Sequence, residues 1–368
     1  MDIFEQISLQ PILFFILYGV TGVVPLIAAL YLLLRRGNAF APDVTPPLRL
    51  RRWAASFFAV LTLGHVWWLL FYIFPRNIHS MDDMLISVGY WVAVVLDWVT
   101  LLPTIAGTLL AMLQDRHRPV WPILAAMIPF VAMGGVIMVN PGELLMQITF
   151  AYIILLYVSF TLYIAFALRK YRRWLLDNYA DLERKEVRLT HVLLIVFVLL
   201  FILYALVDVN TPVLIYFLHV LELTIFGFLL WRVETLPQLE LPTQPQQASP
   251  VKIDIPLIDQ LLKENCEDTQ LYREHDLSLQ QLAQAVGTNR YYLSLYFSRK
   301  GITYNTYINN LRVDYFIRRY QELAAAERPV VAQQLASESG YHSYSTFARA
   351  FTIRKGQSVT AWIRQQKR

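Results

Sequence analysis

The sequence has little charge and almost no cysteine. Only 16% of its 368 residues are Asp, Glu, Lys or Arg, against about 25% in a typical soluble domain. Cys266 is the single cysteine, which excludes an internal disulfide and any metal site built from several cysteines. The low charge is atypical of an ordinary soluble protein and points to another environment for much of the chain.

Catalytic motifs are also missing. The sequence has no HExxH pair, no Ser and His set in a nucleophile motif, and no carboxylate cluster beside a glycine-rich loop. We therefore expect no enzyme activity, no cofactor and no metal site. The stretch MDIFEQISLQP at the N-terminus carries no Lys or Arg and so lacks the basic region of a cleaved signal peptide.

Apolar sequence is abundant: 56% of the residues are hydrophobic and the mean hydropathy is +0.42. Seven apolar runs are long enough to cross a hydrocarbon core of about 30 Å as helices. The predicted transmembrane helices are Ile12–Leu34, Trp53–Phe74, Leu85–Leu113, Val120–Val139, Leu144–Leu168, His191–Val209 and Val213–Trp231. Helices of a soluble bundle would be amphipathic rather than apolar on all sides, which excludes that alternative.

The basic residues between these runs alternate strongly from one side to the other. Segments 35–52, 114–119 and 169–190 carry 5, 2 and 7 Lys or Arg, and Arg232 follows the last run. The N-terminus and the intervening loops carry only Arg76. Because basic loops remain in the cytoplasm, we expect a multi-pass protein of the cytoplasmic membrane, with the N-terminus outside and the C-terminus in the cytoplasm.

Composition changes after the last apolar run. Residues 233–256 are rich in Pro, Gln and Ser and show no hydrophobic periodicity, which predicts a semi-extended linker. The expected organisation is therefore all-α, with a seven-helix membrane domain at 1–232, the linker at 233–256 and a helical domain at 257–368.

The helical domain contains one design twice: a short apolar helix, a turn at a glycine and a second helix. Gly287 and Gly340 mark the turns, Thr288 or Asn289 is expected to cap the second helix of the first unit, and a helix from Thr303 to about Leu323 joins the units. The stripes expected to be buried are Leu279, Leu282, Ala283, Val286, Leu293, Tyr296 and Phe297 in the first unit, and Val331, Leu335, Ala336, Phe347 and Phe351 in the second. The pattern predicts two helix-turn-helix units.

The segments that carry these units resemble the DNA-binding domain of AraC/XylS-type transcription regulators. They are LSLQQLAQAVGTNRYYLSLYF, the connector YNTYINNLRVDYF, and LASESGYHSYSTFARAF followed by GQSVTAWIR. Val359 and Thr352 depart from the family, which usually has Pro and Lys there. The resemblance implies a bacterial regulator of the one-component type that binds double-stranded DNA, with the second helix of each unit in the major groove.

Residues outside the buried stripes are candidates for DNA contact. Those expected to reach base edges are Arg290, Tyr291, Ser294, Leu295, Tyr344, Ser345 and Arg349. Those expected to reach phosphates are Arg299, Lys300, Arg312, Arg354 and Lys355. The segment after Asp276 carries 13 Lys or Arg against 4 Asp or Glu, which favours a polyanionic partner.

Four ionisable residues inside the predicted spans, His65, Asp97, His219 and Glu222, are candidates for an intramembrane sensing site; the alternative is pairing that only holds the helices together. The basic segment 169–190 is expected to be a helix that extends over the lipid surface, or one that docks on the DNA-binding domain or a second subunit.

The sequence thus predicts a membrane-embedded transcription regulator, whose partners are DNA, the lipid bilayer, a second copy of the chain and an unidentified small-molecule or membrane signal. Two alternatives are a membrane-anchored scaffold or signalling protein whose helix-turn-helix domain binds protein, and a membrane enzyme or transporter regulated by that domain.

Overall fold

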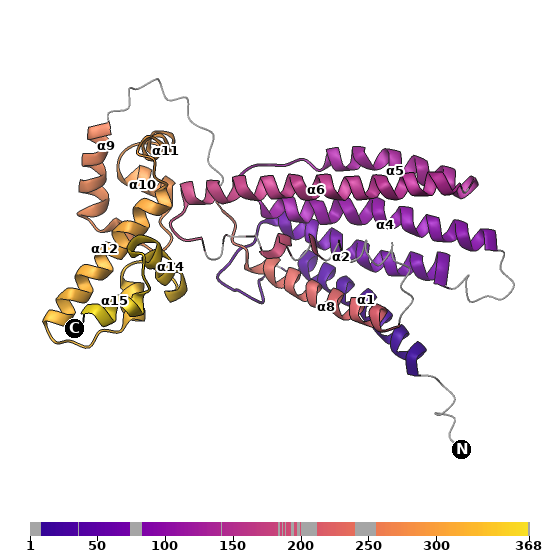
Figure 1. The fold of residues 1–368 in the computed structure, drawn as a ribbon, viewed down its shortest axis with the longest axis horizontal. Helices are drawn as coiled ribbons and strands as arrows, with labels where there is room; N and C mark the ends of the chain where they lie inside the picture. The colour runs from indigo at the N-terminus through magenta and orange to yellow at the C-terminus, as the bar shows by residue number, and fades with distance from the viewer. Residues whose placement is uncertain are drawn as a thin grey trace, which may run out of the picture. The chain divides into compact units, whose positions relative to one another are not determined.

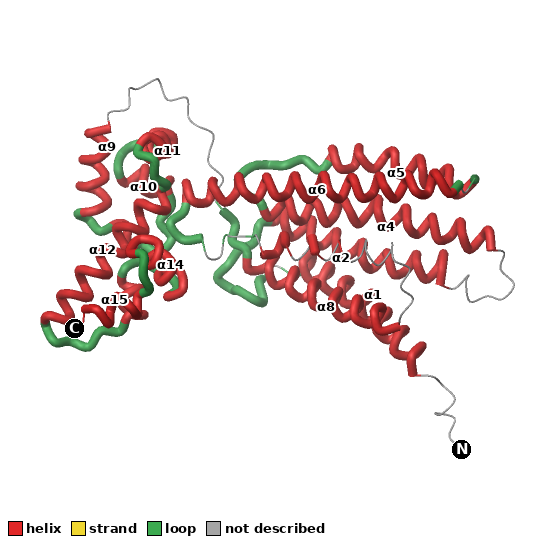
Figure 2. The backbone as a smooth tube through the Cα atoms, viewed as in Figure 1, coloured by secondary structure: helices red, strands yellow, loops and turns green. Residues whose placement is uncertain are grey.

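The computed structural model describes residues 9–35, 37–73, 83–140, 142–182, scattered residues between 185 and 199, 212–239 and 255–366. The described residues are helical or in loops and include no strand, so the expected all-α class is confirmed (Figure 1, Figure 2). The chain divides into two compact units. One comprises Met1–Leu168 and Val187–Leu239, and the other comprises Arg169–Glu186 and Glu240–Arg368.

The first unit is a set of long apolar helices. They are α1 (Leu9–Leu34), α2 (Leu48–Trp68) with its π-helical extension η2 (Leu69–Ile73), α4 (Asp83–Met112), α5 (Trp121–Val139), the first part of α6 (Glu143–Asn178) and α8 (Pro212–Thr235). α2 packs against α1 and α4, and α8 packs against both α1 and α2. Glycine allows close approach, because a Cβ on Gly107 would lie 2.2 Å from the ring of Trp53.

Six described helices are long and apolar enough to cross a membrane: Ile12–Leu34, Leu48–Phe71, Asp83–Met112, Trp121–Val139, Glu143–Asn178 and Tyr216–Thr235. Each coincides with a predicted span, although the fifth continues past Leu168 to Asn178. The predicted span His191–Val209 lies mostly outside the described residues, so the count of seven stays a prediction. Large apolar side chains such as Ile128 (68% exposed) and Val139 (80% exposed) point away from the packed interior, which is compatible with contact with lipid.

The chain remains packed against the first unit for some residues after α8. The backbone N–H of Gln238 donates to the carbonyl of Thr45 (2.9 Å), and the Gln114 side-chain amide bonds to the backbone at Pro237 (3.0 Å) and Leu239 (2.8 Å). The first three residues of the predicted linker therefore belong to α8, and residues 237–239 contact the first unit, while residues 240–254 lie outside the described residues.

The second unit is built from short helices around two cores. Its helices are α9 (Ile255–Leu262), η3 (Lys263–Glu267), η4 (Leu271–Arg273), α10 (Leu279–Ala285), α11 (Arg290–Arg299), α12 (Tyr304–Ala325), α13 (Ala332–Glu338), α14 (Tyr344–Lys355) and α15 (Val359–Gln366). The pairs α10–α11 and α13–α14 each surround one core. Helix α12 contributes Tyr304 and Ile308 to the first core and Phe316 and Tyr320 to the second, so it joins the two helix-turn-helix units.

Local signals in the sequence account for where these helices begin and end. Ser278 and Gln281 form a reciprocal capping box, and the Asn289 side chain accepts a hydrogen bond from Tyr292 N (2.9 Å), so Asn289 rather than Thr288 is the cap. Gly340 has a φ of 98°, and a Cβ there would lie 2.7 Å from a backbone oxygen. The predicted stripes are buried with one exception: Val331 is 59% exposed because it occupies the N-cap position of α13.

Candidate nucleic-acid interface

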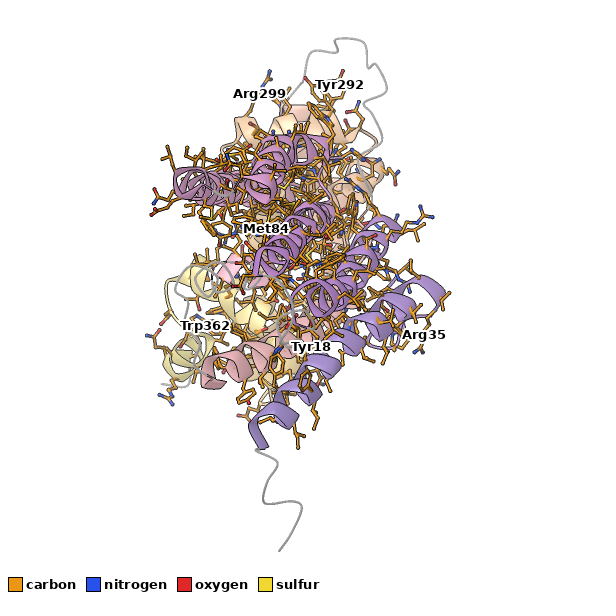
Figure 3. The ribbon with its side chains drawn as sticks, turned by 90° about the vertical axis from the view of Figure 1, so that its right-hand side faces the viewer. Tyr18, Arg35, Met84, Tyr292, Arg299 and Trp362 are labelled. Carbon is orange, nitrogen blue, oxygen red and sulfur yellow. The ribbon has the colours of Figure 1, made fainter. Side chains whose placement is uncertain are left out.

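The second helix of each helix-turn-helix unit is anchored along one face and exposed along the other. Leu293, Tyr296 and Phe297 bury one side of α11, and Phe347 and Phe351 bury one side of α14. Figure 3 shows Tyr292 and Arg299 projecting from the surface of α11. Because a recognition helix must present a fixed row of side chains to the groove, this anchoring suits it to read DNA.

The residues predicted to reach bases are mostly on the exposed faces. On α11, Tyr291 is 59% exposed, Ser294 is exposed and Leu295 is half-buried. On α14, Tyr344, Ser345 and Arg349 are exposed. Arginine can donate two hydrogen bonds to guanine, and serine and tyrosine can contact several bases. Their role in DNA contact stays a prediction.

Four of the five residues predicted to reach phosphates also lie at the surface. Arg299 and Lys355 are exposed, while Lys300 pairs with Asp259 (2.9 Å) and Arg354 with Asp314 (3.1 Å). The hydrogen bond from the Tyr296 hydroxyl, and then Lys300, lower the pKa of Asp259. Exposed ion pairs of this kind contribute little to stability, so a phosphate can displace the carboxylate at small cost.

Arg312 is the exception, and the prediction that it contacts phosphate is wrong. Its side chain is fully buried, and its guanidinium donates to the backbone carbonyls of Tyr272 (2.7 Å) and Glu274 (2.5 Å). It also lies over the ring of Tyr341, 5.4 Å from the centroid. Burial lowers the pKa of Arg312. The residue therefore holds the chain before α10 against the connector helix and is inaccessible to DNA.

The segment Arg169–Glu186, which includes the end of α6, belongs to the second unit and is named the docked segment below; its described residues contact the first helix-turn-helix unit and α12. The Asn305 side chain donates to the carbonyls of Tyr179 (3.0 Å) and Ala180 (2.7 Å), and Ala180 is part of the first core. Tyr179 also forms an isolated antiparallel bridge with Ser278. Of the alternatives for this segment, the structure thus favours a helical extension that ends in contact with the helix-turn-helix domain.

The docked segment reaches the predicted base-reading residue Arg290. The Arg290 guanidinium donates from Nε to Asn178 Oδ1 (2.8 Å), and a second donor, Nη2, bonds to the same oxygen. Burial in this contact lowers the pKa of Arg290, which is half-buried. In this arrangement the side chain that would read guanine is held by the docked segment.

Within the first unit, three of the four candidate sensing residues lie together. His65 on α2 and His219 and Glu222 on α8 form one cluster, beside the buried hydroxyl of Thr21 on α1. The Asp97 carboxylate instead accepts hydrogen bonds from the indole N–H groups of Trp67 (2.8 Å) and Trp68. A role for any of the four in sensing stays a prediction.

Sequence reasoning did not identify Thr21, Asn178 or Asn305. A hydroxyl in an apolar run was a usable signal for Thr21, because such a group needs a partner inside a membrane. No local signal identifies the two asparagines, because their partners are distant in the sequence.

Comparison with known proteins agrees with the geometry of the second unit. A family model described as a helix-turn-helix domain matches residues 282–365, which run from α10 to α15. No curated protein and no solved structure matches the chain. The match supports a DNA-binding regulatory domain at residues 282–365, in a chain whose other unit is built from long apolar helices.

Proposed function

We propose that this protein is a membrane-embedded transcription regulator whose C-terminal domain binds specific DNA sequences in the cytoplasm. One observation carries the proposal: two complete helix-turn-helix units with exposed second helices share a chain with six helices apolar enough to cross a membrane. The apolar helices receive a signal, and the DNA-binding domain responds to it.

The docked segment provides the connection between these parts. Helix α6 runs without a break from Glu143, among the apolar helices, to Asn178, whose side chain holds Arg290. While that contact persists, Arg290 cannot make a bidentate contact with guanine. We propose that the signal shifts the equilibrium between a docked state and a released state. A ligand changes such an equilibrium only by binding the two states differently.

The test is selection of DNA by the full-length protein in lipid nanodiscs at about 0.15 M salt, because affinity for DNA depends strongly on salt. A randomised duplex pool should yield a site with two short blocks about one helical turn, or about 34–36 Å, apart. The Arg349→Ala variant should lose preference within one block. The Lys355→Ala variant should weaken binding to all sequences alike, because a phosphate contact carries no sequence information.

A selection with no enriched site would refute the proposal if the Asn178→Ala variant, in which Arg290 is released, also enriched nothing. That result would favour a scaffold whose domain binds protein. Substrate uptake or turnover by the purified protein would instead favour a regulated transporter or enzyme.

A further inference from the structure

The cluster inside the first unit has the composition of a metal site. One ligand atom from each of His65, His219 and Glu222 lies within 4.8 Å of the other two. The Thr21 hydroxyl lies 2.9 Å from His65 Nε2 and 3.3 Å from His219 Nδ1. The three helices that carry these groups, α1, α2 and α8, pack against one another.

The His65 ring is held in the tautomer that metal ligation requires. Its Nδ1 is 2.9 Å from the carbonyl oxygen of Leu61, which can only accept, so Nδ1 carries the hydrogen. The lone pair of a neutral ring is then on Nε2, which lies 2.9 Å from the Thr21 hydroxyl beside the cluster. Ligating histidines generally donate their second ring nitrogen in this way, because the bond fixes the ring and its tautomer. The Tyr18 ring packs beside His65, with centroids 4.8 Å apart.

His219 and Glu222 are three residues apart on α8 and present their ligand atoms on one face. His219 Nδ1 is 3.6 Å from Glu222 Oε2. In a tetrahedral zinc site with bonds of about 2.0–2.1 Å, ligand atoms are about 3.3–3.4 Å apart. Because the ligand atoms lie within 4.8 Å of one another, no separation needs to close by more than about 1.5 Å, a change that side-chain rotation provides.

The surroundings also favour a bound cation. The side chains of His219 and Glu222 are 14% and 15% exposed, and Thr21 is fully buried. An isolated carboxylate is costly in apolar surroundings, and a cation beside it offsets that cost. Imidazole ligands select zinc and its neighbours in the transition series rather than magnesium or calcium.

We propose that His65, His219 and Glu222 bind one divalent transition-metal ion of the zinc class. Two neutral imidazoles and one carboxylate give three protein ligands and leave a fourth position for water, hydroxide or a small anion. Binding of the metal does not require DNA. Only the idea that the metal, or a ligand at the fourth position, is the regulatory signal rests on the proposed function.

The experiment uses the full-length protein, without a polyhistidine tag, in lipid nanodiscs. Zn²⁺ is titrated by calorimetry, and Co²⁺ is added separately because its visible absorption reports the ligand set. We expect one ion per chain. Affinity should fall at least about tenfold in His65→Ala, His219→Ala and Glu222→Gln, since each removes one of three ligands. His117→Ala is the matched control, because His117 is exposed in a loop and is not part of the cluster.

A ligand exchange keeps the test decisive if an alanine variant fails to fold. The His219→Cys variant should still bind Co²⁺ and should add an absorption band from the thiolate ligand. The proposal is overturned if the wild-type protein binds no Zn²⁺ at micromolar concentrations, or if the binding that occurs is unaffected by the three ligand substitutions. DNA affinity is measured in separate samples, so failure of the metal site and failure of DNA binding give different results.

Discussion

Removing the Asn178 side chain should increase the affinity of the protein for its DNA site. The oxygen of this amide accepts two hydrogen bonds from the Arg290 guanidinium, one of them at 2.8 Å. The Asn178→Ala substitution therefore releases the charged group that is predicted to read guanine. Affinity increases because the protein no longer has to break this contact before it binds DNA.

The size of the effect follows from the contact. A hydrogen bond to a charged group contributes about 1.5–3 kcal/mol net, and about 1.4 kcal/mol corresponds to a tenfold change in an equilibrium constant. One such bond, broken when the protein binds DNA, therefore corresponds to an increase of about 10- to 140-fold in DNA affinity for Asn178→Ala. The observed value should lie below the upper end of this range, because Asn305 still holds the docked segment through two carbonyls.

A substitution at the same residue that is expected to lower the affinity for DNA provides the control. Asn178→Asp puts a carboxylate against Arg290 and converts a neutral acceptor into a charged one, which strengthens the docked contact. This variant should bind DNA more weakly than the wild type. The assay is fluorescence anisotropy with the selected duplex and full-length protein in nanodiscs, at one salt concentration. If Asn178→Ala binds DNA no more tightly than wild type and Asn178→Asp no more weakly, the docked segment does not restrain Arg290.

Three further outcomes can be measured. Gly340→Ala should lower the free energy of unfolding, measured by chemical denaturation, by about 2–4 kcal/mol, because the added Cβ would lie 2.7 Å from a carbonyl oxygen. Gly287→Ala, with open space around the glycine, should lower it by only about 1 kcal/mol, and equal effects of the two substitutions would contradict this steric argument. Lys355→Ala should reduce the slope of log DNA affinity against log salt concentration by about 1. Arg312→Ala should instead lower the melting temperature of the protein, and a reduced salt slope in a folded Arg312→Ala protein would contradict the burial of Arg312. Burial raises the pKa of Cys266 to about 12, above its ordinary value of 9.0, so the contribution of the protonated thiol to stability is complete below pH 9 and is lost as the pH rises toward 12. The thiol should resist alkylation at pH 8 until the protein is unfolded, and rapid labelling of the native protein would refute this.

Features set by periodicity along the chain were predictable. The apolar runs coincide with the long helices of the first unit because length and hydropathy alone decide whether a helix suits a membrane. The buried stripes of α10, α11 and α14 were predictable because spacings of three and four residues define one helix face.

The error at Arg312 was avoidable from the same periodicity. Ile308, Arg312, Phe316 and Tyr320 are four residues apart and are all buried on one face of α12. The charge of Arg312 suggested an exposed phosphate contact, but its position on the stripe indicated burial. The backbone carbonyls that accept its hydrogen bonds come from η4 and its C-cap residue, about 40 residues earlier, and no local pattern reveals that contact.

Contacts between distant segments were not predictable. The amide of Asn178 meets Arg290 only because the end of α6 reaches α11, and a single asparagine in a basic segment carries no sign of this. The grouping of His65 with His219 similarly depends on the packing of α2 against α8. In both cases the chemistry of each side chain was readable, whereas its partner was set by tertiary structure.

The buried position of Arg312 has a consequence for the DNA sites that the protein can recognise. Its guanidinium binds carbonyls ahead of α10 and lies over Tyr341, so it ties the chain of the first helix-turn-helix unit to that of the second. Together with α12, this contact holds the second helices of the two helix-turn-helix units, α11 and α14, at a fixed distance and orientation. Inserting one base pair between two contacted blocks rotates them by about 35°, because B-DNA has about 10–10.5 base pairs per turn. A rigid pair of helices cannot follow that rotation. We therefore expect the selected DNA sites to tolerate base substitutions within a block far better than any change in the spacing between the blocks.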